Sequence, residues 1–266
     1  PVCGCLSRGS VRAGSGSQGI RGRIDGEEKA HSRGINPVEK VMNDDYLNRI
    51  RKNVRDIQSS LPGGVLMVAA AKKRSPDEAR AAIEAGVKII GHNYVQEAER
   101  MRQAIDEPLR WHMIGHLQRN KVKKAVRLFD MIETIDSERL AEEVNKRCDS
   151  EGKVMPVLIE INSGKESNKT GVLPENVRSL ILQINNLPNL EILGLMTMGP
   201  RFGNPEDARP YFKTTRKVFE QIKNAEIPNV EMRYLSMGMS NTYRIAIEEG
   251  ANIVRVGTML FGEREK

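Results

Sequence analysis

The residue best placed for covalent chemistry is a lysine at the end of an apolar segment. Residues 65–71 read VLMVAAA, and Lys72 follows directly. If this segment is a buried strand, Lys72 points to the mouth of the fold or to solvent, while Lys73 points the other way, because side chains alternate along a strand. A lysine amine that is partly withdrawn from water can form a Schiff base with an aldehyde. A solvated surface pair of Lys72 and Lys73 is the alternative.

Two segments near the end of the chain have the residues of a phosphate site. Gly238 and Gly257 allow the backbone to approach a ligand closely, and Ser240 and Thr258 supply hydroxyl groups. The residues after Ser240 predict a helix, whose first N–H groups favour an anion. A simple N-cap role for Ser240 is the alternative, and capping is compatible with phosphate binding.

An aldehyde-reactive lysine and a phosphate site together fit one ligand, pyridoxal 5′-phosphate (PLP), which has an aldehyde at one end and a phosphate at the other. Arg255, near the end of the last predicted strand, would then lie between them and meet the ring nitrogen. An arginine stays cationic there, so the ring nitrogen stays unprotonated. This weakens the electron sink on which PLP carbanion chemistry depends.

The elements that must position these residues alternate regularly. An amphipathic helix is predicted over 45–60, with Leu47, Ile50, Val54 and Ile57 on one face. Strands are then predicted at 65–71, 87–90, 111–114, 131–135, 155–161, 191–195, 232–235 and 252–256, and the helices between them start near 75, 94, 118, 137, 174, 206 and 240. Eight such units in about 200 residues predict the α/β class and a single closed (β/α)8 TIM barrel with an extra N-terminal helix. A doubly wound open sheet and a five-stranded fold are the alternatives.

Polar residues gather at the predicted carboxyl ends of the strands, where barrels of this type have their sites. They are Lys72, Asn93, His116, Asn162, Thr197, the segment 236–240, Gly257 and Thr258. Each of them alone could be a turn or cap residue. Their coincidence over most of the units favours a functional site at this end of the barrel.

Several motifs over about residues 45–264 resemble those of the pyridoxal phosphate homeostasis protein family. They are VAAAK (68–72), GHNYVQE (91–97), WHMIGHLQ (111–118), GLMT (194–197), LSMGMS (235–240) and VRVGT (254–258), followed by Phe261 and Gly262. The resemblance implies the fold type III PLP barrel, which is similar to the N-terminal domain of alanine racemase. It also implies a protein that binds, carries or buffers PLP inside cells, with effects on amino-acid and keto-acid metabolism and no assigned reaction.

The same resemblance implies roles for seven residues. Lys72 would hold PLP as an internal aldimine, and Arg255 would face the pyridine nitrogen. The phosphate would be held by Ser240, Gly257 and Thr258 and by backbone around Met239, with Asn93 beside the cofactor. No catalytic residue and no metal ligand is predicted.

Three residues depart from the family pattern. His92 stands where the family has a glutamate, which removes a carboxylate that we expect near the cofactor edge. Ala71 and Lys73 replace the usual serine before and threonine after the lysine. Lys73 adds a cation next to the aldimine lysine, and we hypothesise that it lowers the pKa of the aldimine.

The second function to consider is a PLP-dependent racemase or a related amino-acid enzyme. Two-base racemases of this fold type take a tyrosine from an additional β domain across a dimer, and about 10 residues follow the last predicted strand here. Tyr94 and Tyr243 are candidate replacements, but the family position gives Tyr94 no such role and packing is the expected role of Tyr243. A carrier, with PLP-requiring apoenzymes as its partners, is therefore the main prediction, and a monomer is expected.

The ends and the charge of the chain add weaker signals. Residues 1–42 contain no aromatic residue and are predicted to be a disordered or extended tail, with the PLP-binding domain over 43–266. The three cysteines form no disulfide framework, which favours a reducing, cytoplasmic location. No apolar run is long enough to span a membrane. The net charge of +7 and the basic run Arg119, Lys121, Lys123, Lys124 and Arg127 would suit nucleic acid, but few aromatic residues accompany them, so no nucleic-acid partner is predicted.

Overall fold

The computed structural model of the protein describes residues 37–167, 169–200 and 203–263, with side chains from residue 44 onward. Within these residues, eight parallel strands pair in chain order and close into a barrel. The strands are β1 Leu66–Ala70, β2 Ile89–His92, β3 Arg110–Met113, β4 Met131–Ile135, β5 Met155–Ile161, β6 Leu190–Thr197, β7 Val230–Ser236 and β8 Ile253–Val256. The predicted (β/α)8 barrel is confirmed, and the open sheet is excluded.

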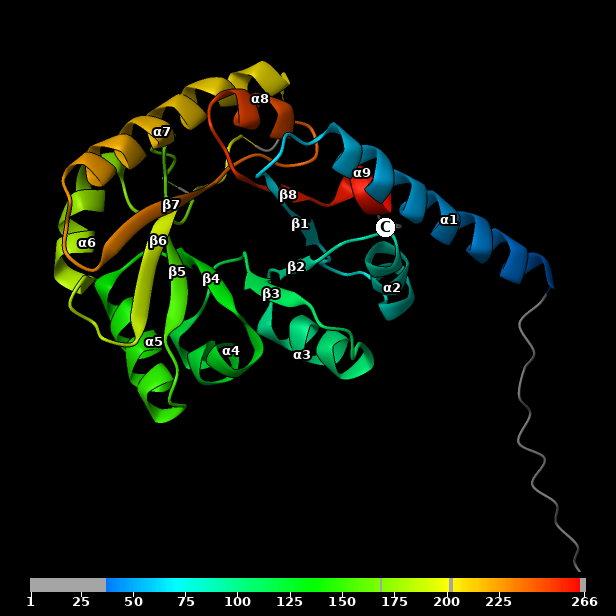
Figure 1. Ribbon diagram of the computed structural model, residues 1–266, viewed down its shortest axis with the longest axis horizontal. Helices are drawn as coiled ribbons and strands as arrows, with labels where there is room; N and C mark the ends of the chain where they lie inside the picture. Colours follow the sequence, from blue (N-terminus) through cyan, green and yellow to red (C-terminus); the bar gives the residue numbers. More distant parts are fainter. Residues whose placement is uncertain (1–36, 168, 201–202, 264–266) are drawn as a thin grey trace, which may run out of the picture.

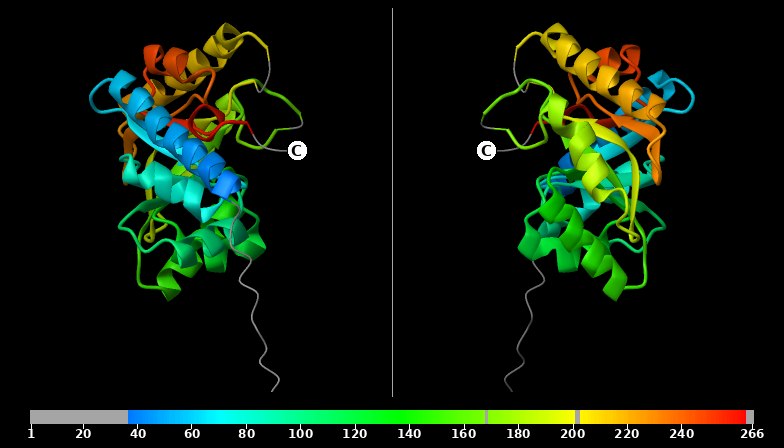
Figure 2. Two further views of the ribbon diagram at one scale, coloured as in Figure 1. Left: turned by 90° about the vertical axis from the view of Figure 1, so that its right-hand side faces the viewer. Right: turned by 90° about the vertical axis from the view of Figure 1, so that its left-hand side faces the viewer.

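Helices surround the strands in a ring, as Figure 1 shows from one end and Figure 2 from two sides. They are α1 Pro37–Ser60, α2 Pro76–Glu84, α3 Val95–Ala104, α4 Val122–Leu128, α5 Glu138–Ser150, α6 Val177–Ile184, α7 Arg209–Asn224, α8 Tyr243–Glu248 and α9 Thr258–Phe261. Short 3-10 turns, Arg119–Lys121, Pro174–Asn176 and Pro205–Ala208, lead into α4, α6 and α7. Ser75 caps α2 with a full capping box, as its sequence predicts.

The two faces of the strands pack separately. The inner face holds a small apolar cluster that includes Val68, Ile89 and Leu158, while the outer face packs against the helices in a much larger cluster. The inside is narrow, because a Cβ atom at Gly91 would lie 2.6 Å from Val68 Cγ1. Side chains alternate along a strand, so residues two apart share a face, and this alternation decides which side chains reach the barrel interior.

Helix α1 closes the barrel where β1 meets β8. Its apolar stripe is confirmed, since Ile50, Val54 and Ile57 are buried. The Tyr46 hydroxyl donates a 2.6 Å hydrogen bond to Glu78 on α2, and its oxygen lies 2.8 Å from the carbonyl oxygen of Phe261 on α9. The helix thus ties the first and last strand–helix units together, and Figure 1 shows it beside α2 and α9.

Helices α4, α6 and α7 begin after their 3-10 turns, three or four residues later than predicted, and two more helices also begin elsewhere. Helix α1 starts at Pro37 rather than near residue 45. Helix α8 starts at Tyr243 rather than at 240, because residues 239–242 form a turn in which the Met239 carbonyl accepts N–H bonds from Thr242 and Tyr243. The prediction for the tail falls mainly on residues 1–36, which lie outside the described residues, and the boundary at residue 42 stays a prediction.

Candidate functional site

Lys72 lies just beyond β1 at the mouth of the barrel. Its Nζ atom is 5.0 Å from the centroid of the Tyr94 ring, which follows β2, so the amine reaches along the mouth between these strands. A cation over an aromatic face is held by electrostatic attraction. Lys73 is exposed, has a left-handed backbone (φ +57°) and donates its N–H to Glu97 Oε2 at 3.1 Å. Lys72, by contrast, is half-buried.

The loops after β7 and β8 are tied together by one serine. Ser240 Oγ accepts hydrogen bonds from the N–H groups of Gly257 (3.1 Å) and Met259 (3.2 Å). The N-cap role considered for Ser240 is wrong, since α8 begins three residues later. Within the described part of the chain, the N–H groups of Ser240, Asn241 and Thr258 have no hydrogen-bond partner. Such free loop amides can bind an anion.

These loops adjoin the lysine. In the β1–β8 ladder Val68 pairs with Arg255 and Ala69 with Val256. A Cβ atom at Gly257 would lie 3.4 Å from the carbonyl oxygen of Ala70, two residues before Lys72. At Gly238 the backbone is left-handed (φ +87°), and a Cβ atom there would lie 2.6 Å from Ala246 Cβ, so this turn requires glycine. The folded chain thus brings the lysine and the loop amides to one side of the mouth.

The other residues predicted at the mouth are exposed or half-buried. Thr258 and Met239 are exposed, and 39% of the Met239 surface is accessible. Asn93 is half-buried beside the mouth, where a Cβ atom at Gly115, two residues after β3, would meet its backbone at 2.6 Å. Together with Lys72, these residues line the same end of the barrel as the two loops.

Arg255 lies inside the barrel with 2% of its surface exposed. It donates to Ser236 Oγ, to the Thr197 carbonyl at 2.7 Å and to Met198 Sδ at 3.6 Å. Of its five N–H groups, Nε–H and one on Nη1 have no partner among the described residues. Burial lowers the pKa of Arg255, and the charges of Glu133 and Glu160 oppose that shift. An arginine guanidinium stays charged in proteins.

Beneath Arg255 runs a chain of buried polar side chains that the sequence reasoning missed. Ser236 Oγ donates to Glu133 Oε2 at 2.6 Å, and His112 Nδ1 lies 2.7 Å from Glu133 Oε1. Burial by itself raises the pKa of Glu133, but the bond and charge of His112 and the charge of Arg255 outweigh it and lower the pKa. A charged residue in an otherwise apolar strand, as in MIETI for β4, is the signal that could have revealed it.

A second buried carboxyl, also missed, faces the interior from β5. Glu160 is 6% exposed, and its Oε1 accepts a 2.8 Å bond from Thr170. Its Oε2 has no partner in the described residues. Burial raises the pKa of Glu160 above the usual range, although the Thr170 bond opposes the shift.

Three of the polar residues at strand ends have structural partners instead. Asn162 closes a turn through both its amide atoms to the backbone of Glu166, at 2.8 and 3.0 Å. Thr197 is fully buried and donates to the Ile161 carbonyl at 2.9 Å. His116 is exposed and lies 3.4 Å from Asp136. The turn role considered for such residues is therefore correct for Asn162, whereas Thr197 links the ends of β6 and β5.

We expected position 92 to lie near the cofactor edge, but the structure places His92 elsewhere. The neighbouring Gly91 faces the interior, so His92 points outward, where its ring stacks on Trp111 at 5.9 Å between centroids. It is fully buried, and both ring nitrogens lack partners in the described residues. Burial lowers the pKa of His92 to about 4.

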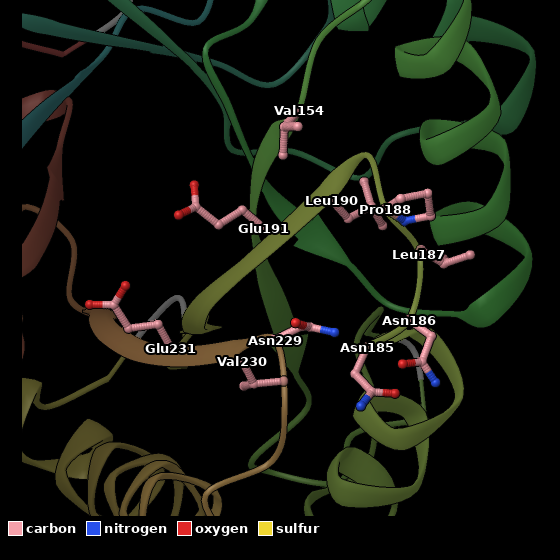
Figure 3. A pocket seen from close by; sticks show the side chains of 10 residues that line it. All are labelled: Val154, Asn185, Asn186, Leu187, Pro188, Leu190, Glu191, Asn229, Val230 and Glu231. Carbon is pink, nitrogen blue, oxygen red and sulfur yellow. The ribbon is translucent and has the colours of Figure 1, made fainter.

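The surface of the described residues includes a large and a smaller hollow. One of about 680 Å³ lies at the amino ends of β6 and β7, opposite the mouth; Figure 3 shows Glu191 and Glu231 on these neighbouring strands. The other, of about 360 Å³, lies beside the mouth and is lined by Asn93, Tyr94 and His116 among others. The described residues contain no cluster of potential metal ligands and no helix able to cross a membrane. In the basic run, Lys124 pairs with Glu99 and Arg127 with Glu151.

Comparison with known proteins identifies the family. The model of the family described as "Alanine racemase, N-terminal domain" matches residues 46–265. The "Pyridoxal phosphate homeostasis protein" of Aquifex aeolicus (strain VF5) is 44% identical over 200 residues, which is 75% of this chain and 87% of that protein. The chain belongs to the pyridoxal phosphate homeostasis protein family. A Bos taurus protein of the same name is 33% identical over 247 residues, 87% of this chain and 88% of the relative.

Solved structures agree with this family membership. PipY of Synechococcus elongatus PCC7942 without PLP has a TM-score of 0.76 and 33% identity, covering 80% of this chain and all of PipY. The structure of PipY with PLP bound has a TM-score of 0.74 and 32% identity over the same shares. An alanine racemase from Clostridium difficile 630 has a TM-score of 0.65 and 18% identity, covering 83% of this chain and 57% of the racemase, and shows the shared fold alone.

Proposed function

We propose that this chain binds PLP and carries or buffers it, as the names of its relatives suggest. One observation carries the proposal: the half-buried amine of Lys72 and the loop amides beside Ser240 and Thr258 lie at one side of the barrel mouth. The amine suits the aldehyde and the amides suit the phosphate. The unpartnered N–H groups of the buried Arg255 suit an acceptor such as the ring nitrogen.

The residues of the chain then have distinct roles. Lys72 Nζ supplies the covalent attachment, and the Tyr94 ring keeps the amine at the mouth. The fixed backbone of residues 238–240 and 257–258 holds the phosphate, with Asn93 and Met239 at the rim. When bound, PLP supplies an electron sink, which a permanently charged Arg255 weakens because it gives the ring nitrogen no proton. This arrangement supports holding PLP rather than turnover.

A racemase is the second function, and Tyr94 is the residue that would support it, because it lies beside Lys72. Its side chain is half exposed, however, and within the described residues its hydroxyl makes no hydrogen bond that would position it as an acid or base. Tyr243 is buried, and its hydroxyl lies 3.3 Å from Ser60 Oγ on α1, so it has the packing role we expected. Transaminase or racemase turnover at ordinary rates by the PLP-loaded protein would overturn the carrier function.

The test compares two adjacent lysines. Wild type, Lys72→Ala and Lys73→Ala are titrated with PLP, and the visible absorbance of the bound cofactor is recorded. Wild type and Lys73→Ala should develop the band of a Schiff base and keep it through gel filtration, whereas Lys72→Ala should not. Equal bands in all three proteins would refute attachment at Lys72.

Three further parts of the proposal concern its setting. We propose a cytoplasmic location, which the free, buried thiol of Cys148 suits, and cell fractionation tests it. PLP-requiring apoenzymes are the proposed recipients, and transfer from loaded protein to an apoenzyme, faster than from free PLP at equal concentration, would support them. A monomer is proposed, and light scattering coupled to gel filtration measures it.

A further inference from the structure

Four buried polar side chains from four different strands form one hydrogen-bonded chain across the barrel interior. In order they are His112 on β3, Glu133 on β4, Ser236 on β7 and Arg255 on β8. None is more than 3% exposed. The direction of the chain is fixed at Ser236, because its hydroxyl has a single proton to donate, which goes to Glu133, and so it accepts from Arg255.

Stability alone does not explain why these four polar side chains are buried together. Removing charges from water is costly, and a buried ion pair is often replaced by apolar residues without loss of stability. The rest of the interior shows that this barrel can be filled that way, since Val68, Ile89 and Leu158 pack there. Charged groups on the inner face of the strands, next to the loops of the mouth, therefore suggest a role in the site.

The hydrogen bonds leave the Arg255 side chain with one defined orientation. Ser236, the Thr197 carbonyl and Met198 Sδ occupy three of its N–H groups. Glu133 Oε2 lies 3.8 Å from Arg255 Nη1, too far for a hydrogen bond but close enough to balance the charge. The two unpartnered N–H groups are those that remain for a ligand at the mouth. Glu133 touches no ligand in this arrangement and acts through Ser236 and Arg255.

We infer that Glu133 is a positioning residue of the PLP site, which fixes the guanidinium of Arg255 through Ser236 and so sets the affinity for PLP and the spectrum of the bound cofactor. The inference rests on the proposed function. It adds Glu133 to a site in which Arg255 is the other residue inside the barrel, and it assigns the His112–Glu133 pair to that site rather than to the core.

The test uses Glu133→Gln, which keeps the size of the side chain and removes its charge. The dissociation constant for PLP should rise at least about tenfold, the effect of losing one hydrogen bond or charge contact of ordinary strength. The visible band of the bound cofactor should shift or titrate at a different pH. Ser236→Ala cuts the link while leaving both charges, and should produce the same spectral change with a smaller loss of affinity.

Two controls separate positioning from stability. Glu143→Gln removes a carboxylate that pairs with Arg147 on the outer helix α5, and Thr215→Val removes a fully buried hydroxyl on α7. Both should leave the affinity and the spectrum unchanged, even where the melting temperature falls. If Glu133→Gln does not fold, Ser236→Ala alone decides.

The outcomes also distinguish the two proposals. Wild-type protein that takes up no PLP refutes the proposed function. Wild-type protein that binds PLP normally, with Ser236→Ala and folded Glu133→Gln matching it in affinity and spectrum, refutes the positioning role while leaving the proposed function intact.

Discussion

The inner and outer faces of the barrel strands each bury a histidine, but among the described residues only the inner one has a hydrogen-bond partner. On the inner face of β3, His112 lies 2.7 Å from Glu133 and belongs to the chain that reaches Arg255. On the outer face of β2, His92 is equally buried but has no partner for either ring nitrogen. The difference shows that polar groups inside this barrel are organised around the mouth. Within the described part of the chain, His92 is by contrast an unpaired polar side chain in the core with no connection to the site.

The largest expected effect comes from His92. The unfolded chain binds a proton at His92 below its ordinary pKa of 6.5, whereas the folded chain binds one only below about 4. Between these values the unfolded state holds more protons, so stability is lost as the pH falls, by about 2 kcal/mol between about pH 7 and pH 5.

Replacing His92 removes that loss. His92→Phe keeps a flat ring to stack on Trp111 and should reduce the pH dependence of the unfolding free energy, measured by urea denaturation, by that amount. PLP affinity should not change. A variant with the same pH dependence as wild type would contradict the outer, unpartnered placement of His92.

A smaller effect is expected for the inner carboxyl that lacks a full set of partners. Burial raises the pKa of Glu160, so its folded state loses stability as the pH rises through the ordinary carboxyl range, because the charged form is disfavoured. Glu160→Gln should therefore gain about 1 kcal/mol at neutral pH and nothing in acid. Denaturation at both pH values measures this, and a loss at neutral pH would show that Glu160 is ionised and stabilising.

The smallest effect is expected at Lys73, the cation next to the proposed PLP lysine. Its side chain is exposed, so water screens its charge. In Lys73→Thr the visible band of the loaded protein should titrate at a higher pH, because removing a cation favours the protonated form, but only by about a few tenths of a pH unit. An unchanged titration would end the hypothesis that Lys73 tunes the attachment.

Much of the site could be predicted because it depends on local signals. The apolar run before Lys72, the glycines at 238 and 257 and the regular alternation of units each act within a few residues. What could not be predicted depends on contacts far apart in the chain. Ser236 reaches Glu133 across 103 positions, and Ser240 bonds Gly257 instead of capping a helix.

The error over His92 has a different origin. The face on which a strand residue lies changes with a shift of one position in register, and the sequence alone did not determine that register. The structure determines it through Gly91, whose missing side chain leaves room for Val68 and Ile114 inside the barrel. The glycine therefore faces inward, and the histidine beside it faces the helices.

The most direct test of the account is where PLP attaches. Loaded wild-type protein is reduced with borohydride, digested, and its labelled peptide identified by mass spectrometry. We predict a phosphopyridoxyl group on Lys72 at close to one per chain under saturating PLP, and none in Lys72→Ala. A label spread over surface lysines, or concentrated at Lys73, would contradict it.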